Sequence, residues 1–151
     1  MKRADVYLAF GGECEAAFEF YKSVFGGEFS MMLRFEEGPE EMKKHMSEAD
    51  MQKVMHVSLP FGQSVLMGSD MPGSTPGGGS FAVSITADTR KEADELFAAL
   101  SAGGKATMPM DDAFWGDYFG MLNDKFGVQW MVSCKRNRLP KNFYEGWGQS
   151  D

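Results

Sequence analysis

Histidine and cysteine are both scarce in this chain of 151 residues, which contains two of each. The two cysteines, Cys14 and Cys134, are too few and too far apart for a disulfide framework or a cysteine-rich zinc site. No stretch approaches the roughly 18 consecutive apolar residues that a membrane-spanning helix needs, and no apolar leader precedes Cys14. We therefore expect a cytoplasmic protein that is not integral to a membrane.

Basic residues are also in the minority. The chain has 15 Lys and Arg against 22 Asp and Glu, which gives a formal net charge of -7. An acidic surface repels the phosphates of nucleic acids and of anionic membranes, so neither is an expected partner. Hydrophobic residues make up 43% of the chain, which is enough for a core. At this length we expect a single domain over residues 1–151.

An internal repeat appears when the sequence is compared with itself at an offset of 77 residues. The matching positions are Val6 with Val83, Leu8 with Ile85, Glu15 with Glu92, Ala16 with Ala93, Phe20 with Phe97, Gly26 with Gly103, and Gly27 with Gly104. Each copy predicts a strand, a helix ended by Gly-Gly and three further strands. The fold class is therefore α+β, with two βαβββ modules at about 4–70 and 80–134 and a C-terminal tail at 135–151.

The helices of the two modules each show one apolar stripe with spacings of three and four residues. The stripes consist of Ala17, Phe20, Tyr21 and Val24 in the first helix, and of Ala93, Leu96, Phe97 and Leu100 in the second. These patterns place Phe20 and Phe97 in the core. Thr89 and Glu92 have the spacing of a capping box, which predicts the start of the second helix.

The last hairpins of the modules match at a shorter offset of 65 residues, which aligns Phe61-Gly62 with Phe126-Gly127. Twelve extra residues therefore lie in the first module, within an acidic excursion at 36–53 that could form a short helix from Glu40 to Met46. The Gly- and Pro-rich loop at 71–79 suits a linker between the modules or a lid over a cavity.

Several motifs together strongly resemble the vicinal-oxygen-chelate (glyoxalase/bleomycin-resistance/dioxygenase) superfamily and its PhnB-like branch. They are Gly11-Gly12, Glu15-Ala16, Phe20-Tyr21, Val24-Phe25-Gly26-Gly27, Met55-His56-Val57, Ser69-Asp70, the run from Phe114 to Gly120, and Asp124-Lys125-Phe126-Gly127. The resemblance implies two modules whose mixed sheets curl into a barrel-like wall around a small-molecule cavity. It also implies a homodimer.

The superfamily's enzymes hold a divalent ion with His and Glu side chains from the first and last strands of each module. The corresponding positions here are near Val6, Ala82, Met67 and Met131, none of which suits such an ion. A shift of one or two residues would bring in Asp5 or Gln129. We expect no metal and no other cofactor, with a divalent ion at a shifted site as the alternative.

A catalytic role is open for His56, which could act as a general acid or base with Asp70, Asp112 or Tyr118. A hydrogen-bonded structural histidine is the competing interpretation. His45 lies in the excursion, where a solvated side chain is expected. Cys14 begins a helix whose dipole would favour a thiolate, although packing under the sheet is the commoner role of such a residue.

The expected ligand-binding residues are Phe114, Trp115, Tyr118, Met67 and Gln129. Thirteen Met and thirteen Phe supply adaptable apolar lining, although the aromatic run could equally form the edge of the core. We expect a small-molecule-binding or metal-independent member of the superfamily. The alternatives are a metal-dependent lyase, isomerase or dioxygenase, and an interaction module. A demethylubiquinone methyltransferase, the activity often given to the PhnB-like branch, is disfavoured because no Gly-rich dinucleotide-type loop is present.

Overall fold

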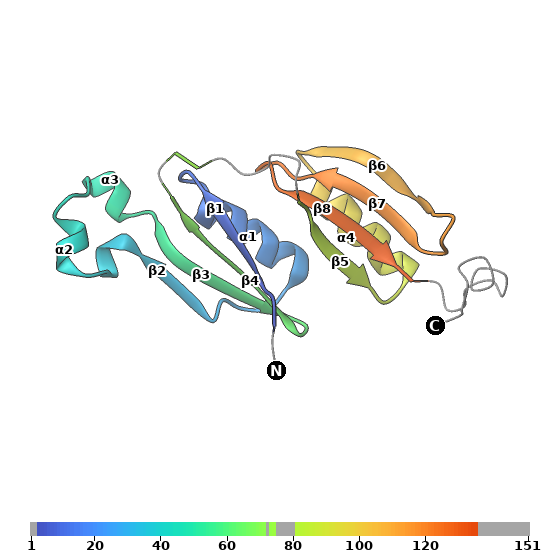
Figure 1. The fold of residues 1–151 in the computed structure, drawn as a ribbon, viewed down its shortest axis with the longest axis horizontal. Coiled ribbons are helices and arrows are strands. Elements are labelled where there is room, and N and C mark those ends of the chain that lie inside the picture. Colours follow the sequence, from blue (N-terminus) through green and yellow to red (C-terminus); the bar gives the residue numbers. More distant parts are fainter. Residues whose placement is uncertain (1–2, 72, 75–80, 136–151) are drawn as a thin grey trace, which may run out of the picture. The chain divides into compact units, whose positions relative to one another are not determined.

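The computed structural model describes residues 3–71, 73–74 and 81–135. The chain divides into two compact units, residues 1–77 and 78–151. Each unit contains one four-stranded mixed sheet and a helix of 12 residues that packs against it (Figure 1). The modules expected from the sequence fall within these two units. In the described part of the chain, no helix is long and apolar enough to cross a membrane.

The first unit has the strand order β1-β4-β3-β2, in which only β1 and β4 are parallel. Its elements are β1 (Val6–Phe10), α1 (Cys14–Phe25), β2 (Met31–Arg34), the 3-10 helix η1 (Phe35–Glu37), α2 (Glu40–Lys43), α3 (Glu48–Met51), β3 (Val54–Phe61) and β4 (Ser64–Asp70).

The second unit repeats this plan with the order β5-β8-β7-β6 and a parallel pair formed by β5 and β8. Its elements are β5 (Val83–Ala87), α4 (Arg90–Ser101), β6 (Lys105–Asp112), β7 (Tyr118–Asn123) and β8 (Gln129–Cys134). The predicted βαβββ topology is therefore confirmed in both units.

The hairpin alignment at an offset of 65 residues was wrong by one residue. Val6 pairs with Leu66 in the first unit, and its repeat mate Val83 pairs with Trp130 in the second. The final strands therefore correspond at an offset of 64. Two residues join β3 to β4, whereas five residues, 124–128, join β7 to β8. Of the Phe-Gly pairs that guided the alignment, Phe61-Gly62 spans the end of β3 and the first residue of its short loop, whereas Phe126-Gly127 lies inside the longer loop.

Helix α1 packs against its sheet through a stripe that differs from the predicted one. The residues that the structure buries are Cys14, Ala17, Phe18 and Tyr21. Phe20 is only half-buried, so its predicted core position was only partly correct. A Cβ atom at Gly68 would lie 2.6 Å from the Phe18 ring. The glycine in β4 thus makes room for the phenylalanine.

Helix α4 begins as predicted, because the Thr89 hydroxyl accepts a hydrogen bond from the amide of Glu92 at 3.1 Å. The Glu92 carboxylate accepts one from the amide of Asp88. Ala93 and Leu100 are buried, but Phe97 is half-buried, and so is Leu96. The predicted core position of Phe97 was therefore only partly correct.

The excursion contains two helices of four residues each, α2 and α3, instead of one helix from Glu40 to Met46. Ser47 stands between them and accepts a hydrogen bond from the amide of Asp50 at 3.1 Å, which starts α3. The predictions about the tail at 136–151, and about most of the loop at 71–79, concern residues outside the described ranges.

Candidate functional site

The face of the first sheet that lies opposite α1 carries a group of five side chains. Because side chains alternate along a strand, and because Gly68 meets Phe18 of α1, Met67 points to the opposite face. Register places Tyr7 and Ser58 beside Met67, and Met31 beside Ser58. We call this surface, defined by Tyr7, Met31, His56, Ser58 and Met67, the open face. Tyr7 and Met31 are 45% and 46% exposed there.

His56 links two hydroxyl groups on the open face. Its Nδ1 lies 3.5 Å from the Tyr7 hydroxyl, and its Nε2 lies 2.9 Å from the Ser58 hydroxyl. The Tyr7 and His56 rings are also in tilted contact, with 5.8 Å between their centroids. A neutral imidazole donates from one nitrogen and accepts at the other. The imidazole can therefore accept from one hydroxyl while it donates to the other, and it lies between the exposed Tyr7 and the buried Ser58.

Asp70 takes a structural position instead of joining His56. One carboxylate oxygen accepts hydrogen bonds from the amides of Gly12 and Cys14 at 2.8 and 3.0 Å, and the other accepts one from the amide of Val54 at 3.0 Å. Helix α1 has no side-chain cap of its own, because Glu13 makes none. Asp70 therefore caps α1 from the end of β4.

Cys14 is completely buried at the start of α1. Burial raises the pKa of its thiol, and the neighbouring carboxylates of Asp70 and Glu15 raise it further. The thiol is therefore protonated at neutral pH, and Cys14 has the packing role that was the favoured interpretation.

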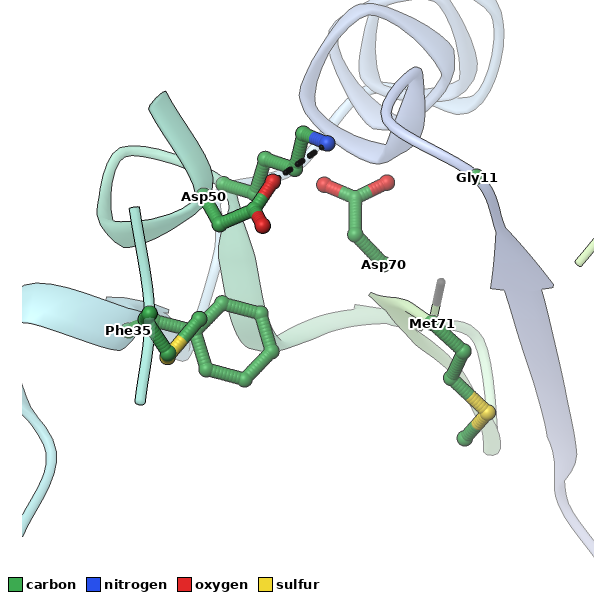
Figure 2. A pocket seen from close by; sticks show the side chains of 7 residues that line it. Gly11, Phe35, Asp50, Asp70 and Met71 are labelled. Atoms are coloured by element: carbon green, nitrogen blue, oxygen red, sulfur yellow. Dashed lines mark ion pairs between the residues drawn. The ribbon is translucent and has the colours of Figure 1, made fainter. Parts of the chain in front are cut away.

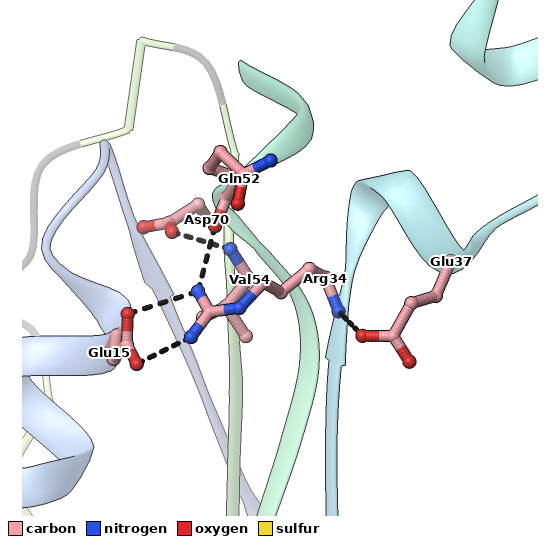
Figure 3. A network of polar contacts seen from close by, with 6 residues as sticks. All are labelled: Glu15, Arg34, Glu37, Gln52, Val54 and Asp70. Carbon is pink, nitrogen blue, oxygen red and sulfur yellow. Dashed lines mark hydrogen bonds and ion pairs between the residues drawn. The ribbon is translucent and has the colours of Figure 1, made fainter. Parts of the chain in front are cut away.

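A second polar network crosses between α1 and β2 in the first unit (Figure 3). The Arg34 guanidinium donates to both oxygens of Glu15, at 3.0 and 2.6 Å, and to the carbonyl oxygen of Gln52 at 2.8 Å. The hydrogen bonds from Arg34 lower the pKa of the Glu15 carboxyl. This bidentate pair holds the start of the excursion against α1.

Two further sequence candidates, Asp112 and Tyr118, meet in the second unit. Arg90 pairs with Asp112 at 2.8 Å and lies over the Tyr118 ring, 3.9 Å from its centroid. The Tyr118 hydroxyl donates to Asp94, a contact that raises the pKa of Tyr118. Because Asp94 belongs to α4, Tyr118 lies on the helix side of its sheet. His56 and Asp70 belong to the first unit and are not part of this cluster.

The aromatic run lies between β6 and β7, where the side chains have very different surroundings. Phe114 is 83% exposed. Trp115 is half-buried, donates to Asp117 at 3.2 Å and contacts Phe119 with 5.6 Å between ring centroids. Register places Phe119 beside Ser133, on the face of the second sheet away from α4. The structure thus joins Trp115 to Phe119, which belongs to the same predicted aromatic run.

The remaining predicted ligand-binding residues lie on different sheets. Met67 is on the open face of the first sheet, whereas Gln129 pairs with Asn123 at the start of β8. Gln129 points away from α4, as does Met131, because the alternate residue Trp130 is buried between them.

The donors on the strands do not fit the divalent ion of the superfamily's enzymes. Ala82 lies just before β5 and outside the paired strand. Tyr7 rather than Val6 points away from the helix on β1, Ser84 does so on β5, and Met67 and Met131 do so on the last strands. None of these four side chains supplies the nitrogen or carboxylate ligands that such an ion prefers. Among the described residues, no three His, Cys, Asp or Glu side chains cluster closely enough to hold a metal.

Comparison with known proteins identifies the class to which this fold belongs. The profile of the Glyoxalase/Bleomycin resistance protein/Dioxygenase superfamily matches residues 3–132. The chain therefore belongs to this superfamily, has its glyoxalase-like α+β fold, and falls in the PhnB-like branch.

Three relatives illustrate the placement. The crystal structure of protein PA1353 from Pseudomonas aeruginosa is 37% identical, with a TM-score of 0.79 over 91% of this chain and 100% of that one. The PhnB protein from Bacillus cereus, described as a candidate 3-demethylubiquinone-9 3-methyltransferase, is 27% identical, with a TM-score of 0.67 over 88% and 99%. Protein YjdN from Escherichia coli K12 is 28% identical over 87% of this chain and 95% of its own length.

Proposed function

We propose that this protein binds a small, partly apolar organic molecule on the open face of its first sheet and needs no divalent metal to do so. The observation that carries the proposal is the Tyr7–His56–Ser58 chain with Met31 and Met67 beside it. Small-molecule sites combine apolar lining with a few polar groups that fix orientation. Methionine supplies an adaptable apolar surface, and the Tyr7 hydroxyl offers an exposed hydrogen-bonding group.

A catalytic extension of this role is a metal-independent reaction in which His56 moves a proton. It is favoured by the hydroxyl group near each imidazole nitrogen, since a histidine so connected can act as a general acid or base near neutral pH. A metal-dependent lyase, isomerase or dioxygenase is less favoured because the strand positions lack His and Glu. The methyltransferase description of the Bacillus cereus relative receives no support from either mixed sheet.

We further propose that the protein acts as a homodimer in the cytoplasm. The support for this state is membership of a superfamily whose members commonly dimerise. Native mass spectrometry of the full chain would give the number of subunits, and it would also reveal any carried-over small molecule. A purely monomeric spectrum at micromolar concentration would contradict the dimer without affecting the open-face site.

The open-face proposal is tested by replacing Met31 with Glu, which places a charge beside Ser58. Because Met31 is 46% exposed, the fold should tolerate the change, while retention of a carried-over molecule should fall at least about tenfold through the cost of burying a charge. Met108→Glu is the matched control, because Met108 is 47% exposed in the second unit. Equal retention by both variants would contradict the site.

Two further measurements test the role of His56 and the need for a metal independently of each other. His56→Ala removes one polar group of the site and should weaken ligand binding by no more than about tenfold, whereas a reaction that depends on this imidazole should slow by about 100-fold or more. Exposure of the wild type to zinc, nickel, manganese and iron(II) should leave its mass unchanged. One tightly bound ion per subunit would contradict metal independence.

A further inference from the structure

A separate pocket lies in the first unit, between the ends of β1 and β4 and the excursion (Figure 2). Its volume is about 110 Å³. The residues that line it are Gly11, Phe35, Met46, Asp50, Lys53, Asp70 and Met71. None of them belongs to the open face.

The pocket has an apolar part and a polar part. Phe35, Met46 and Met71 supply an aromatic ring and two thioethers, and Met71 remains 44% exposed. The opposite side carries the ion pair of Lys53 and Asp50, with 2.8 Å between its atoms, and the carboxylate of Asp70 (Figure 2). An apolar ligand body with one polar group would match this division.

The charges in the pocket are already matched by partners. Asp70 receives three backbone hydrogen bonds and is only 4% exposed. The hydrogen bond between Lys53 and Asp50 lowers the pKa of Asp50 and raises that of Lys53, so both are charged at neutral pH. A charged ligand would meet at least one like charge and would lose hydration. The pocket therefore favours a neutral molecule.

Lys53 provides the hydrogen-bond donor for such a molecule. An ammonium group has three N–H donors, and the ion pair with Asp50 uses one of them. The Asp50 and Lys53 side chains are 41% and 39% exposed, so this polar side is open to solvent. A ligand oxygen could accept from Lys53 while the body of the ligand contacts the apolar side.

We propose that this pocket is a second binding site, for a small neutral molecule that has an apolar body and one acceptor oxygen, such as a ketone. A cavity of about 150 Å³ holds benzene, so a pocket of about 110 Å³ encloses about four or five non-hydrogen atoms. The carbonyl oxygen of a slightly larger ketone would project toward the solvent-exposed Lys53. The site is independent of the open face, and a failure of either proposal leaves the other untouched.

The test uses cyclopentanone as the probe and the full chain labelled with ¹³C at its methionine methyl groups. The Met46 and Met71 resonances, assigned through Met46→Leu and Met71→Leu, should shift in a saturable way with a millimolar Kd, while the Met108 resonance should not move. Lys53→Met should weaken binding about tenfold, the usual effect of losing one hydrogen bond to a charged group.

Lys44→Met is the matched control, because Lys44 forms a comparable (i,i+3) ion pair with Glu41 but does not line the pocket. It should bind cyclopentanone as the wild type does. Cyclopentylammonium and cyclopentanecarboxylate should each bind at least about tenfold more weakly than the ketone. The proposal is overturned if the two methyl groups show no saturable shift, if Lys53→Met binds as tightly as Lys44→Met, or if a charged analogue binds as tightly as cyclopentanone.

Discussion

Asp70 shows how one side chain can join three segments that are distant in sequence. Its two oxygens accept from the amides of Gly12, Cys14 and Val54, at the start of α1 and the start of β3. Helix α4 has no need of such a residue, because Thr89 caps it locally. In the second unit the position equivalent to Asp70 is Cys134, which pairs with Ala87 as Asp70 pairs with Phe10. The two units solve the same capping problem with different residues.

Asp70→Asn should therefore destabilise the protein. The amide group keeps one acceptor oxygen but turns an NH2 group toward a backbone donor, and hydrogen bonds to a charged acceptor are stronger than those to a neutral one. We expect a loss of about 2–4 kcal/mol in the free energy of unfolding, measured with urea. Asp50→Asn, which breaks a solvent-exposed ion pair, should change it by less than about 1 kcal/mol.

The sequence contained a signal for this role that spacing analysis missed. The segment Gly11-Gly12-Glu13 precedes α1 without a Ser, Thr, Asp or Asn at the capping position, and a buried helix start without such a cap requires a hydrogen-bond acceptor from elsewhere for its amide groups. Asp70 was named only as one of three possible catalytic partners of His56, beside Asp112 and Tyr118. Sequence alone could not choose, because neither the cap nor the Tyr7–His56–Ser58 chain is local.

At the scale of the elements, the repeat predicted the strand and helix order well and the faces of the strands less well. An offset of one residue turns every side chain of a strand to the other face. Placing Val6 instead of Tyr7 on the ligand side had this effect, since Val6 shares the helix side with Leu66. Tyr7 was therefore missed as a residue of the open face, while Met67, its neighbour on β4, was expected on that face and lies there.

The stripe of α1 was misjudged for a similar reason. Phe18 and Phe20 both fit an apolar face when the helix is considered alone, but only Phe18 lies against Gly68. The space that a glycine leaves in β4 is a property of the packed sheet, which periodicity within the helix does not report.

The Arg34–Glu15 pair predicts how the link between α1 and β2 responds to acid. The pKa of Glu15 is lowered below its ordinary value of 4.5 by Arg34, so the stabilisation is fully present above about pH 4.5. It is lost as the pH falls through the lowered pKa. Because Glu15 is 48% exposed, the contribution should be below about 1 kcal/mol.

Comparison of the wild type with Glu15→Gln in urea at pH 6 and pH 3 measures this contribution. The difference in stability should be present at pH 6 and smaller at pH 3. Glu41→Gln is the control, because the Glu41 and Lys44 side chains are 85% and 63% exposed and so exposed an ion pair contributes little to stability. It should show almost no pH-dependent difference. A difference that grows toward low pH would contradict the assignment.

At the scale of the whole molecule, each unit buries its own set of large side chains. Phe10, Phe18, Tyr21 and Leu59 belong to the first, and Leu100, Leu122 and Trp130 belong to the second. Protein segments with separate cores can open separately. Damage to one core should therefore be felt mainly in the same unit.

Phe18→Ala provides the test, because it removes a fully buried ring and should cost about 3–5 kcal/mol. Hydrogen exchange should show a large loss of protection at the amides of β3 and β4, and a smaller loss at those of β7 and β8. Phe20→Ala, at a half-buried position, should reduce protection less in both. Equal losses in the two units after Phe18→Ala would mean that they unfold as one.

The excursion of the first unit also indicates how the two copies of the repeat could come to differ in length. Val6 finds its parallel partner Leu66 sixty positions later, whereas Val83 finds Trp130 after forty-seven. The entropy of closing a flexible loop rises only with the logarithm of its length, so this difference amounts to about 0.2 kcal/mol. Evolution could thus lengthen one copy of a duplicated module almost without penalty to folding. Lys53 and Asp50, which line the second pocket, lie within that added stretch.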